Sequence, residues 1–245
     1  MNSSWNWGVF LQPTPGGDAT YLGWLLQGLA WTVALSLSAW AVALLVGTLL
    51  GVLRTVPSRW LRGLAGAYVE AFRNVPLLVQ LFAWYFVAPE LLPRGWGDAI
   101  KQSNPLAQQF LAAWLCLAFF SAARVCEQVR AGIGSLPPGQ LNAALALGLT
   151  RPQAYRHVLL PMALRLVVPT LTSEFLNVFK NSAVASTIGL VELSRQSQQL
   201  VDYTAQAYEA FLAVTLLYLL INATVMLGMR WVEARARVPG LIGSK

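Results

Sequence analysis

The segment Gly139-Gln-Leu-Asn-Ala-Ala-Leu-Ala-Leu-Gly148, followed by Val158-Leu-Leu-Pro161, lies between two strongly hydrophobic stretches. Its composition suits a short helix, and its alanines and glycine allow another surface to approach the backbone closely. Arginines flank it on both sides, at Arg130, Arg151, Arg156 and Arg165. Arginines in short loops are typical of the cytoplasmic side of a membrane. The sequence therefore predicts a compact cytoplasmic helix on which a soluble protein could push.

The composition identifies the surroundings of this segment. The chain has 245 residues, of which 56% are hydrophobic and 11% charged, and its mean hydropathy is +0.55. A soluble globular protein of this size is far less apolar. Several stretches reach the roughly 18–20 apolar residues that cross a bilayer as a helix. We therefore expect an all-α integral membrane protein.

Five transmembrane helices are expected. They lie at residues 21–53, in a stretch that ends near residue 89, and at 106–124, 166–190 and 208–229. Polar loops are expected at 89–105, 131–165 and 191–206. The chain then divides into an external N-terminal segment (1–20), a membrane domain (21–237) and a cytoplasmic tail (238–245).

The distribution of basic residues sets the orientation. This layout places eleven Lys and Arg on one side and three on the other. Because basic residues favour the cytoplasmic side, the N-terminus is expected outside and the C-terminus inside. The net charge of +7 follows from this topology, so no nucleic-acid partner is expected.

Enzyme and metal signatures are missing from the sequence. The single histidine, His157, lies in the predicted cytoplasmic loop, and no Asp–His–Ser set surrounds it. Cys116 and Cys126 lie ten residues apart in one apolar run, which suits small buried side chains better than a metal site. No Gly-x-x-x-x-Gly-Lys-Ser/Thr loop for nucleotide phosphates occurs. We expect no catalytic residues and no metal site, and any ATP-driven motor must be another polypeptide.

The fourth hydrophobic stretch is unusually polar. Thr170, Glu174, Asn177 and Asn181 fall within an arc of about 60° on a helix, and Lys180 and Ser182 lie beside them. Such a helix cannot face lipid all round, because a charge at the bilayer centre costs several kcal/mol. The polar arc either lines a path for a polar solute or holds the bundle together by hydrogen bonds between helices.

Two further polar groups allow the same pair of interpretations. Arg124, Glu127, Gln128 and Arg130 are spaced three or four apart and can pair along one helix. Alternatively, Arg124 contacts a carboxylate of the solute. Glu70, Arg73 and Asn74 precede Pro76, which predicts a kink in the second stretch.

These motifs resemble those of a known family. Ala143-Ala144, Gly148 and then Val158-x-Leu160-Pro161 resemble the EAA loop of ABC importer permeases. Residues 72–81, 131–140 and 179–190 are similar to the polar amino-acid permeases of that family, over about residues 20–237. Residues 126–130 and 180–182 look most like the glutamate/aspartate importer permeases.

The resemblance implies a type I ABC importer permease in the bacterial inner membrane. Its implied partners are two ATP-binding subunits, a second permease and an external amino-acid-binding protein. The chain itself would bind no cofactor, since ATP and Mg²⁺ are used by the ATPase. Carried over by position, the coupling residues are Asn142, Ala143, Ala144, Gly148 and Pro161. The substrate path would use Arg124, Glu127, Glu174, Asn177, Lys180, Asn181 and Ser182.

The sequence departs from the family pattern at informative positions. Asn142 stands where the motif usually has Glu, and Val158 where it has Ile. A missing carboxylate at the ATPase groove favours a partner permease that is similar but not identical. Asn181 stands where many relatives have Asp, and fewer carboxylates in the path suit glutamate or aspartate.

Other functions remain open from the sequence. The nearest alternative is a permease for glutamine, cystine or another polar amino acid. A secondary transporter or channel that works without ATP is a rival from another class. A non-transporting scaffold is disfavoured, because it gains nothing from so many costly polar residues in a span.

Overall fold

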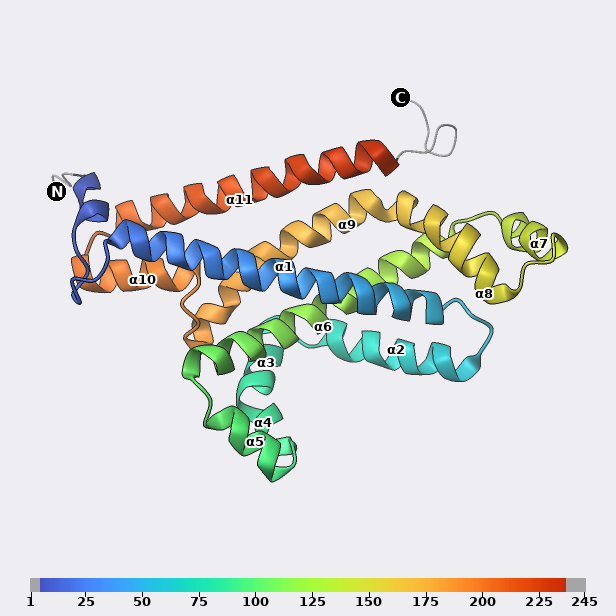
Figure 1. Cartoon of the computed structure of the whole chain (residues 1–245), viewed down its shortest axis with the longest axis horizontal. Helices are drawn as coiled ribbons and strands as arrows, with labels where there is room; N and C mark the ends of the chain where they lie inside the picture. Colours follow the sequence, from blue (N-terminus) through green and yellow to red (C-terminus); the bar gives the residue numbers. More distant parts are fainter. Residues whose placement is uncertain (1–4, 237–245) are drawn as a thin grey trace. The chain divides into compact units, whose positions relative to one another are not determined.

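The computed structural model describes residues 5–236 and is helical almost throughout (Figure 1). Within these residues, the only extended pairing is an isolated bridge between Pro13 and Thr20. The predicted all-α class is therefore confirmed. The helices, in chain order, are η1 (Trp7–Leu11), α1 (Tyr21–Leu53), α2 (Arg59–Asn74), α3 (Leu77–Phe82), η2 (Ala83–Val87), α4 (Ala88–Leu91), α5 (Arg94–Lys101), α6 (Pro105–Gly134), α7 (Pro138–Ala146), α8 (Arg151–Ala154), η3 (Tyr155–Leu159), α9 (Leu160–Ser182), η4 (Ala183–Ile188), α10 (Leu193–Thr204) and α11 (Ala207–Ala236).

Four of the described helical stretches are long and apolar enough to cross a membrane: Tyr21–Leu53, Pro105–Gly134, Arg151–Ile188 and Ala207–Ala236. The broken pair Arg59–Asn74 and Leu77–Leu91 supplies a fifth if it acts as one span. The break falls at Pro76, where the sequence predicts a kink. Val75 is extended, with φ −102° and ψ 130°, because a residue before proline avoids the helical region.

Three of the predicted loops are wrong in part. Residues 89–105 include α4 and α5, and residues 191–206 include α10. The predicted loop 131–165 contains α8 and the first turns of α9 in addition to α7, which the sequence predicts as a short helix. The other helices are short or polar, so hydropathy alone does not distinguish them from loops. The first predicted span, by contrast, coincides with α1.

The expected external segment is described from residue 5 onward. It forms η1, and the backbone N–H of Asn6 donates to the carboxylate of Glu209, at the start of α11, over 2.6 Å. The expected tail at 238–245, and the basic residues Arg237 and Lys245, lie outside the described residues.

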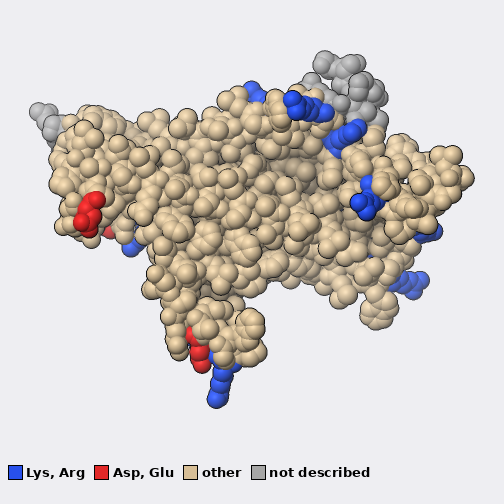
Figure 2. Space-filling model, viewed as in Figure 1, with Lys and Arg blue, Asp and Glu red and all other residues tan. Residues whose placement is uncertain are grey.

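The chain packs as two units, and α1, α6, α9 and α11 each contribute a part to both. Unit 1 comprises Met1–Ala39, Leu77–Leu117 and Val178–Thr224, and unit 2 comprises Trp40–Pro76, Ala118–Asn177 and Val225–Lys245. Unit 1 carries four Lys and Arg against six Asp and Glu, whereas unit 2 carries thirteen against four. Most basic side chains visible in Figure 2 lie over unit 2 elements, and the visible acidic ones lie over unit 1 elements. Basic charge is therefore concentrated in one of the two units.

Unit 1 is organised around a buried carboxylate. Glu192 is fully buried and caps α10 by accepting hydrogen bonds from the backbone N–H groups of Ser194 and Arg195, at 3.0 and 2.9 Å. It also accepts from the hydroxyl of Tyr218 in α11 (3.0 Å) and that of Thr32 in α1 (3.4 Å). Burial raises the pKa of this carboxyl group above its ordinary value, and the hydrogen bonds that it accepts offset only part of that rise. One side chain therefore joins three helices.

Unit 2 depends on close approach between α1 and α6. A Cβ atom added at Gly47 would lie 2.6 Å from Cβ of Val125, and one added at Gly51 would lie 2.8 Å from Cβ of Val129. Two glycines four residues apart form a smooth stripe on α1 against which α6 packs. The Gly-x-x-x-Gly pattern at Gly47 and Gly51 is visible in the sequence and would have predicted this contact.

We predict that Gly47→Ala destabilises the protein, because the new methyl group must displace Val125. Overpacking of this kind costs about 1–3 kcal/mol. Gly63→Ala is the matched control, since no atom lies within 4 Å of the added Cβ and alanine favours a helix over glycine by about 1 kcal/mol. Thermal unfolding of the full chain in one detergent should show a lower midpoint for Gly47→Ala alone. Equal midpoints for the two variants would contradict the packing described.

Candidate functional site

The opening segment of the sequence forms α7, a short helix whose two ends are well defined. Pro138 occupies its first turn, where its missing N–H costs nothing. At the other end Gly148 has a positive φ of 87°. The Gly148 N–H donates to the Leu145 carbonyl at 3.0 Å, and the Leu149 N–H donates to the Ala144 carbonyl at 3.1 Å. This pair of bonds is a Schellman motif, which requires a residue that tolerates the left-handed region.

The side chains of α7 divide between the protein and the surface. Ala144 is buried, whereas Asn142 and Ala143 are exposed. Leu147 is 84% exposed, although nothing in the sequence distinguishes it from the neighbouring leucines. Of the predicted coupling residues, Ala144 holds the helix in place. Asn142 and Ala143 form an outward face together with Leu147 and Gly148.

The segment after α7 connects it to the fourth span. The N–H and hydroxyl groups of Thr150 both donate to the side-chain oxygen of Gln153, at 2.8 and 2.9 Å, which starts α8. A π-helical turn, η3, follows directly. Within it, the Tyr155 hydroxyl donates to the Thr55 carbonyl at 3.1 Å, so the segment is tied to the residues that directly follow α1.

Pro161 explains the wide turn. In a regular α-helix its ring would clash with the carbonyl group of the residue four positions earlier, His157. The π turn Tyr155–Leu159 ends two residues before Pro161, and such turns often occur at functional sites. Pro161 is half-buried, and its role in coupling stays a prediction.

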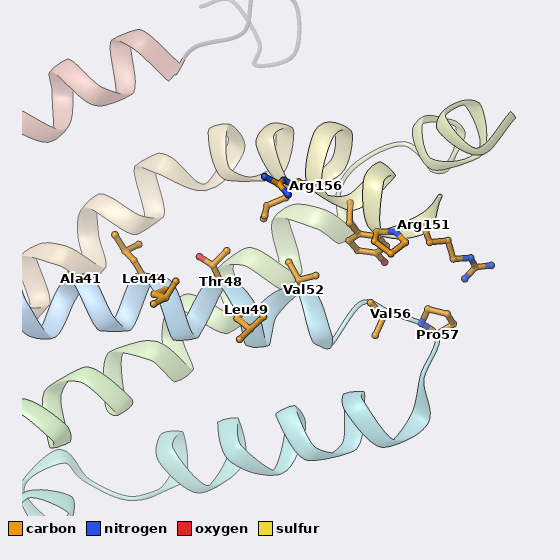
Figure 3. Close-up of a pocket in the computed structure, with 13 residues that line it drawn as sticks. Ala41, Leu44, Thr48, Leu49, Val52, Val56, Pro57, Arg151 and Arg156 are labelled. Carbon is orange, nitrogen blue, oxygen red and sulfur yellow. The ribbon is translucent and has the colours of Figure 1, made fainter. Parts of the chain in front are cut away.

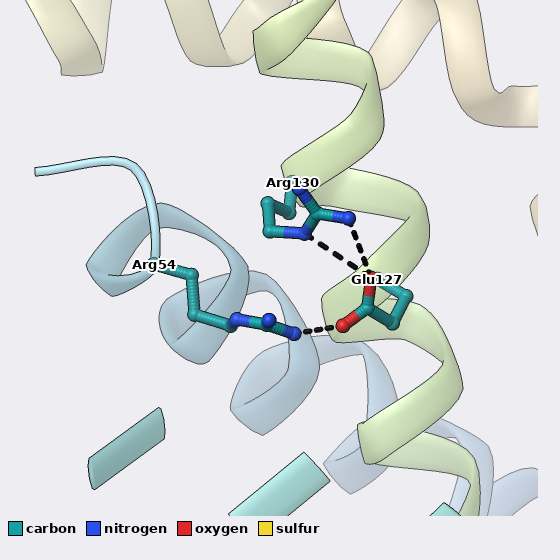
Figure 4. A network of polar contacts seen from close by, with 3 residues as sticks. All are labelled: Arg54, Glu127 and Arg130. Atoms are coloured by element: carbon teal, nitrogen blue, oxygen red, sulfur yellow. Dashed lines mark hydrogen bonds and ion pairs between the residues drawn. The ribbon is translucent and has the colours of Figure 1, made fainter. Parts of the chain in front are cut away.

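A network of charged groups lies where α1 ends against α6. Glu127 accepts a hydrogen bond from Arg54 and two from Arg130, at 3.1 and 2.9 Å (Figure 4). The Glu127–Arg130 pair is one of those predicted from spacing along the helix. Arg54 was not predicted, because spacing along one helix cannot reveal a partner on another. With a guanidinium group on each side, Glu127 acts as an anchor between helices.

Arg124 has a different partner from the one that its spacing predicts. Its Nε atom lies 3.6 Å from an oxygen of Glu174 in α9, and its guanidinium carbon lies 4.8 Å from the Phe120 ring centroid. The Glu174 side chain is 5% exposed and that of Arg124 is 44% exposed. Glu174 therefore relies on Arg124 to offset its burial, while Arg124 keeps part of its donor surface open. Asn177 lies one helical turn beyond Glu174 and is half-buried.

The predicted residues Lys180, Asn181 and Ser182 face three different surroundings in unit 1. Ser182 is buried and donates to the carbonyl of Phe179 at 2.8 Å. Asn181 lines a void of about 10 Å³ beside Leu77 and Cys116. Lys180 is exposed and lines an open pocket of about 370 Å³ with Tyr218 and Asn222. Asn222 was missed, although it is an isolated amide in the apolar α11.

No group of three or more His, Cys, Asp or Glu that could hold a metal ion occurs among residues 5–236. Cys116 and Cys126 are buried and unbonded to each other. The polar groups described above are instead ion pairs, caps and amides placed within or beside long apolar helices.

Long apolar helices, paired charges within them and a capped surface helix between two spans define a polytopic membrane protein. The chain belongs to the family of binding-protein-dependent transport system inner membrane components, whose model matches residues 43–238. It is therefore a permease subunit of the ABC importer type and not an enzyme, as the resemblance implies.

Individual relatives agree with this assignment. The chain is 58% identical to the glutamate/aspartate import permease protein GltJ of Escherichia coli K12, over 100% of both chains. It is 30% identical to the glutamate/aspartate import permease protein GltK of Escherichia coli O6:H1, over 87% of this chain and 94% of that one. A crystal structure of an amino acid ABC transporter with histidines matches with a TM-score of 0.74 and 30% identity, over 88% of this chain and 95% of that one.

We predict that Gly148→Ala loosens α7, because a left-handed conformation costs a residue with Cβ about 1–2 kcal/mol. Gly139→Ala is the control, since the added methyl group meets nothing within 4 Å in a helix that favours alanine. Limited proteolysis should then cut the α7 segment about 5- to 30-fold faster in Gly148→Ala, if local opening precedes cleavage. Equal cleavage rates in the two variants would show that the Schellman motif does not hold α7.

Proposed function

We propose that this chain is the membrane subunit of an ATP-driven importer that carries glutamate and aspartate across the bacterial inner membrane. The observation that carries the proposal is the 58% identity, over the full length of both chains, to a permease named for glutamate/aspartate import. Transport would proceed by alternating access, in which helices rock about a solute site near the middle of the membrane.

The proposed complex contains two ATP-binding subunits, a second permease and an external binding protein. Two different relatives, at 58% and 30% identity, carry the same substrate in their names, which supports a pair of similar but non-identical permeases. In this complex the chain binds no cofactor itself, and ATP and Mg²⁺ act in the ATPase subunits. Its external side receives the amino acid from the binding protein.

The exposed face of α7 is the proposed contact with the ATPase. It presents Asn142, Ala143 and Leu147 at the surface, where small side chains permit close approach. The Schellman motif keeps the helix formed, and the Tyr155–Thr55 hydrogen bond joins the segment after it to the end of α1. Movement of the ATPase would therefore pass through α7 and α8 to a span. Asn142 in place of a carboxylate weakens the charge contribution of this half.

The proposed orientation places the N-terminus outside and the C-terminus in the cytoplasm. We predict that Asn142→Cys reacts with a membrane-impermeant maleimide only from the cytoplasmic side. Trp96→Cys, in α5 and replacing a side chain that is 74% exposed, should react only from the outside. The native Cys116 and Cys126 are buried and give little background. Labelling of Asn142→Cys from the outside would overturn both the orientation and the coupling role of α7.

Arg124 is the proposed contact for a substrate carboxylate, since its guanidinium group is partly exposed and forks readily onto a carboxylate. We predict that Arg124→Met lowers uptake at least tenfold at normal membrane levels. Because this change also strands the buried Glu174, Arg124→Met with Glu174→Gln is the matched control: it removes both charges. Uptake that recovers in the double variant would show that Arg124 only neutralises Glu174.

Uptake by reconstituted vesicles tests the whole proposal. Vesicles holding both permeases and the ATPase should accumulate labelled glutamate and aspartate when ATP and the binding protein are supplied. Preferential uptake of glutamine or cystine would support the nearest alternative. Uptake without ATP would support a secondary transporter.

A further inference from the structure

A large apolar groove in unit 2 lies beside the proposed coupling segment, and the function proposed above assigns it no ligand. Its volume is about 860 Å³, within the range of ligand pockets of roughly 300–1,000 Å³. One wall is the second half of α1, including Leu44, Leu49 and Val52, and the other is the segment around α8 and η3 (Figure 3). Leu49 is 59% exposed, so the groove is open along its length. This α1 wall belongs to a helix that is long and apolar enough to cross a membrane, where acyl chains are available as ligands.

Two arginines give this groove a charged rim. Arg151 and Arg156 line it and are exposed, and no Asp or Glu is among its lining residues. Among residues 5–236, neither guanidinium group has a carboxylate within ion-pair distance. The rim therefore places two guanidinium groups without a carboxylate partner next to an apolar groove.

A phospholipid with a net negative charge matches both features. An acyl chain fits the apolar walls, and each guanidinium group can donate two parallel hydrogen bonds to phosphate oxygens. Basic pockets between membrane helices on the cytoplasmic side bind anionic head groups in this manner. A helix of the second permease could also fill the apolar walls, but it would match the rim only if it placed acidic residues beside Arg151 and Arg156. Charge complementarity therefore favours the lipid.

We propose that this groove binds one anionic phospholipid, such as phosphatidylglycerol, with its head group at the rim that carries Arg151 and Arg156 and an acyl chain along α1. The lipid then bridges α1 and the segment that follows α7. The orientation proposed above is needed only to name the membrane leaflet that supplies the lipid, which is the cytoplasmic leaflet. Loss of amino-acid uptake and loss of lipid binding are separate readouts.

Native mass spectrometry of the intact transporter, titrated with phosphatidylglycerol or phosphatidylcholine, tests the rim. Each basic residue near a membrane surface contributes about fivefold in affinity for an anionic lipid. The double substitution Arg151→Gln with Arg156→Gln should therefore weaken phosphatidylglycerol binding about 30-fold, and it should weaken binding of phosphatidylcholine, whose head group has no net charge, by a clearly smaller factor. Arg59→Gln with Arg62→Gln is the matched control, because both residues are exposed and lie outside the groove. Equal weakening in the two pairs, or none, overturns the proposal.

A photo-reactive amino acid at position 49 identifies the occupant directly. In membranes that contain phosphatidylglycerol, irradiation should add one lipid mass to this chain. A crosslink to the second permease instead would assign the groove to a protein interface and overturn the lipid site. Because this measurement keeps both arginines, it is independent of any folding defect in the Gln variants.

Discussion

The constraint on which the structure depends is that a carboxylate in an apolar helical bundle must find donors inside the protein. Three glutamates meet this constraint in three ways. Glu127 lies between two arginines, Glu174 approaches one, and Glu192 is held by hydroxyl and backbone donors alone. In each case a donor comes from another helix, so the polar interactions join helices that apolar packing alone would leave free to slide.

The same requirement explains why the sequence predicted the fold better than the site. The spans, the kink at Pro76 and the short helix α7 follow from hydropathy, proline chemistry and small residues, which are local properties. The partners of Arg124 and Glu127 depend on which helices meet, and spacing along one helix cannot reveal that. For this reason the sequence predicted Glu127 as a partner of Arg124, whereas the structure pairs Arg124 with Glu174. Helix α10 lies in a stretch that was expected to be a loop. Its sequence is polar and its N-cap residue is Glu192, which is not one of the usual capping residues, so neither hydropathy nor capping marks the helix.

The proposed coupling segment shows how much of a function can rest on backbone geometry. Its predicted residues are mostly small, and their importance does not come from reactive groups. Gly148 permits the Schellman motif, Ala144 lets α7 pack against the protein, and Tyr155 ties the following segment to α1. A substitution here would alter the transmission of movement before it altered any binding pocket. This is the reason that mechanical and substrate-binding defects need separate measurements.

The π turn at Tyr155–Leu159 changes which side chains share a face along the fourth span. A π turn inserts one residue relative to regular α-helix, and one residue corresponds to a rotation of about 100°. A helical wheel drawn continuously from α8 into α9 is therefore out of phase by more than a quarter of a circle. Side chains before the turn and side chains after it belong to one continuous helical stretch, but they do not lie on one continuous face. Arg151 lies before the turn, whereas Glu174, further along α9, meets Arg124 of α6.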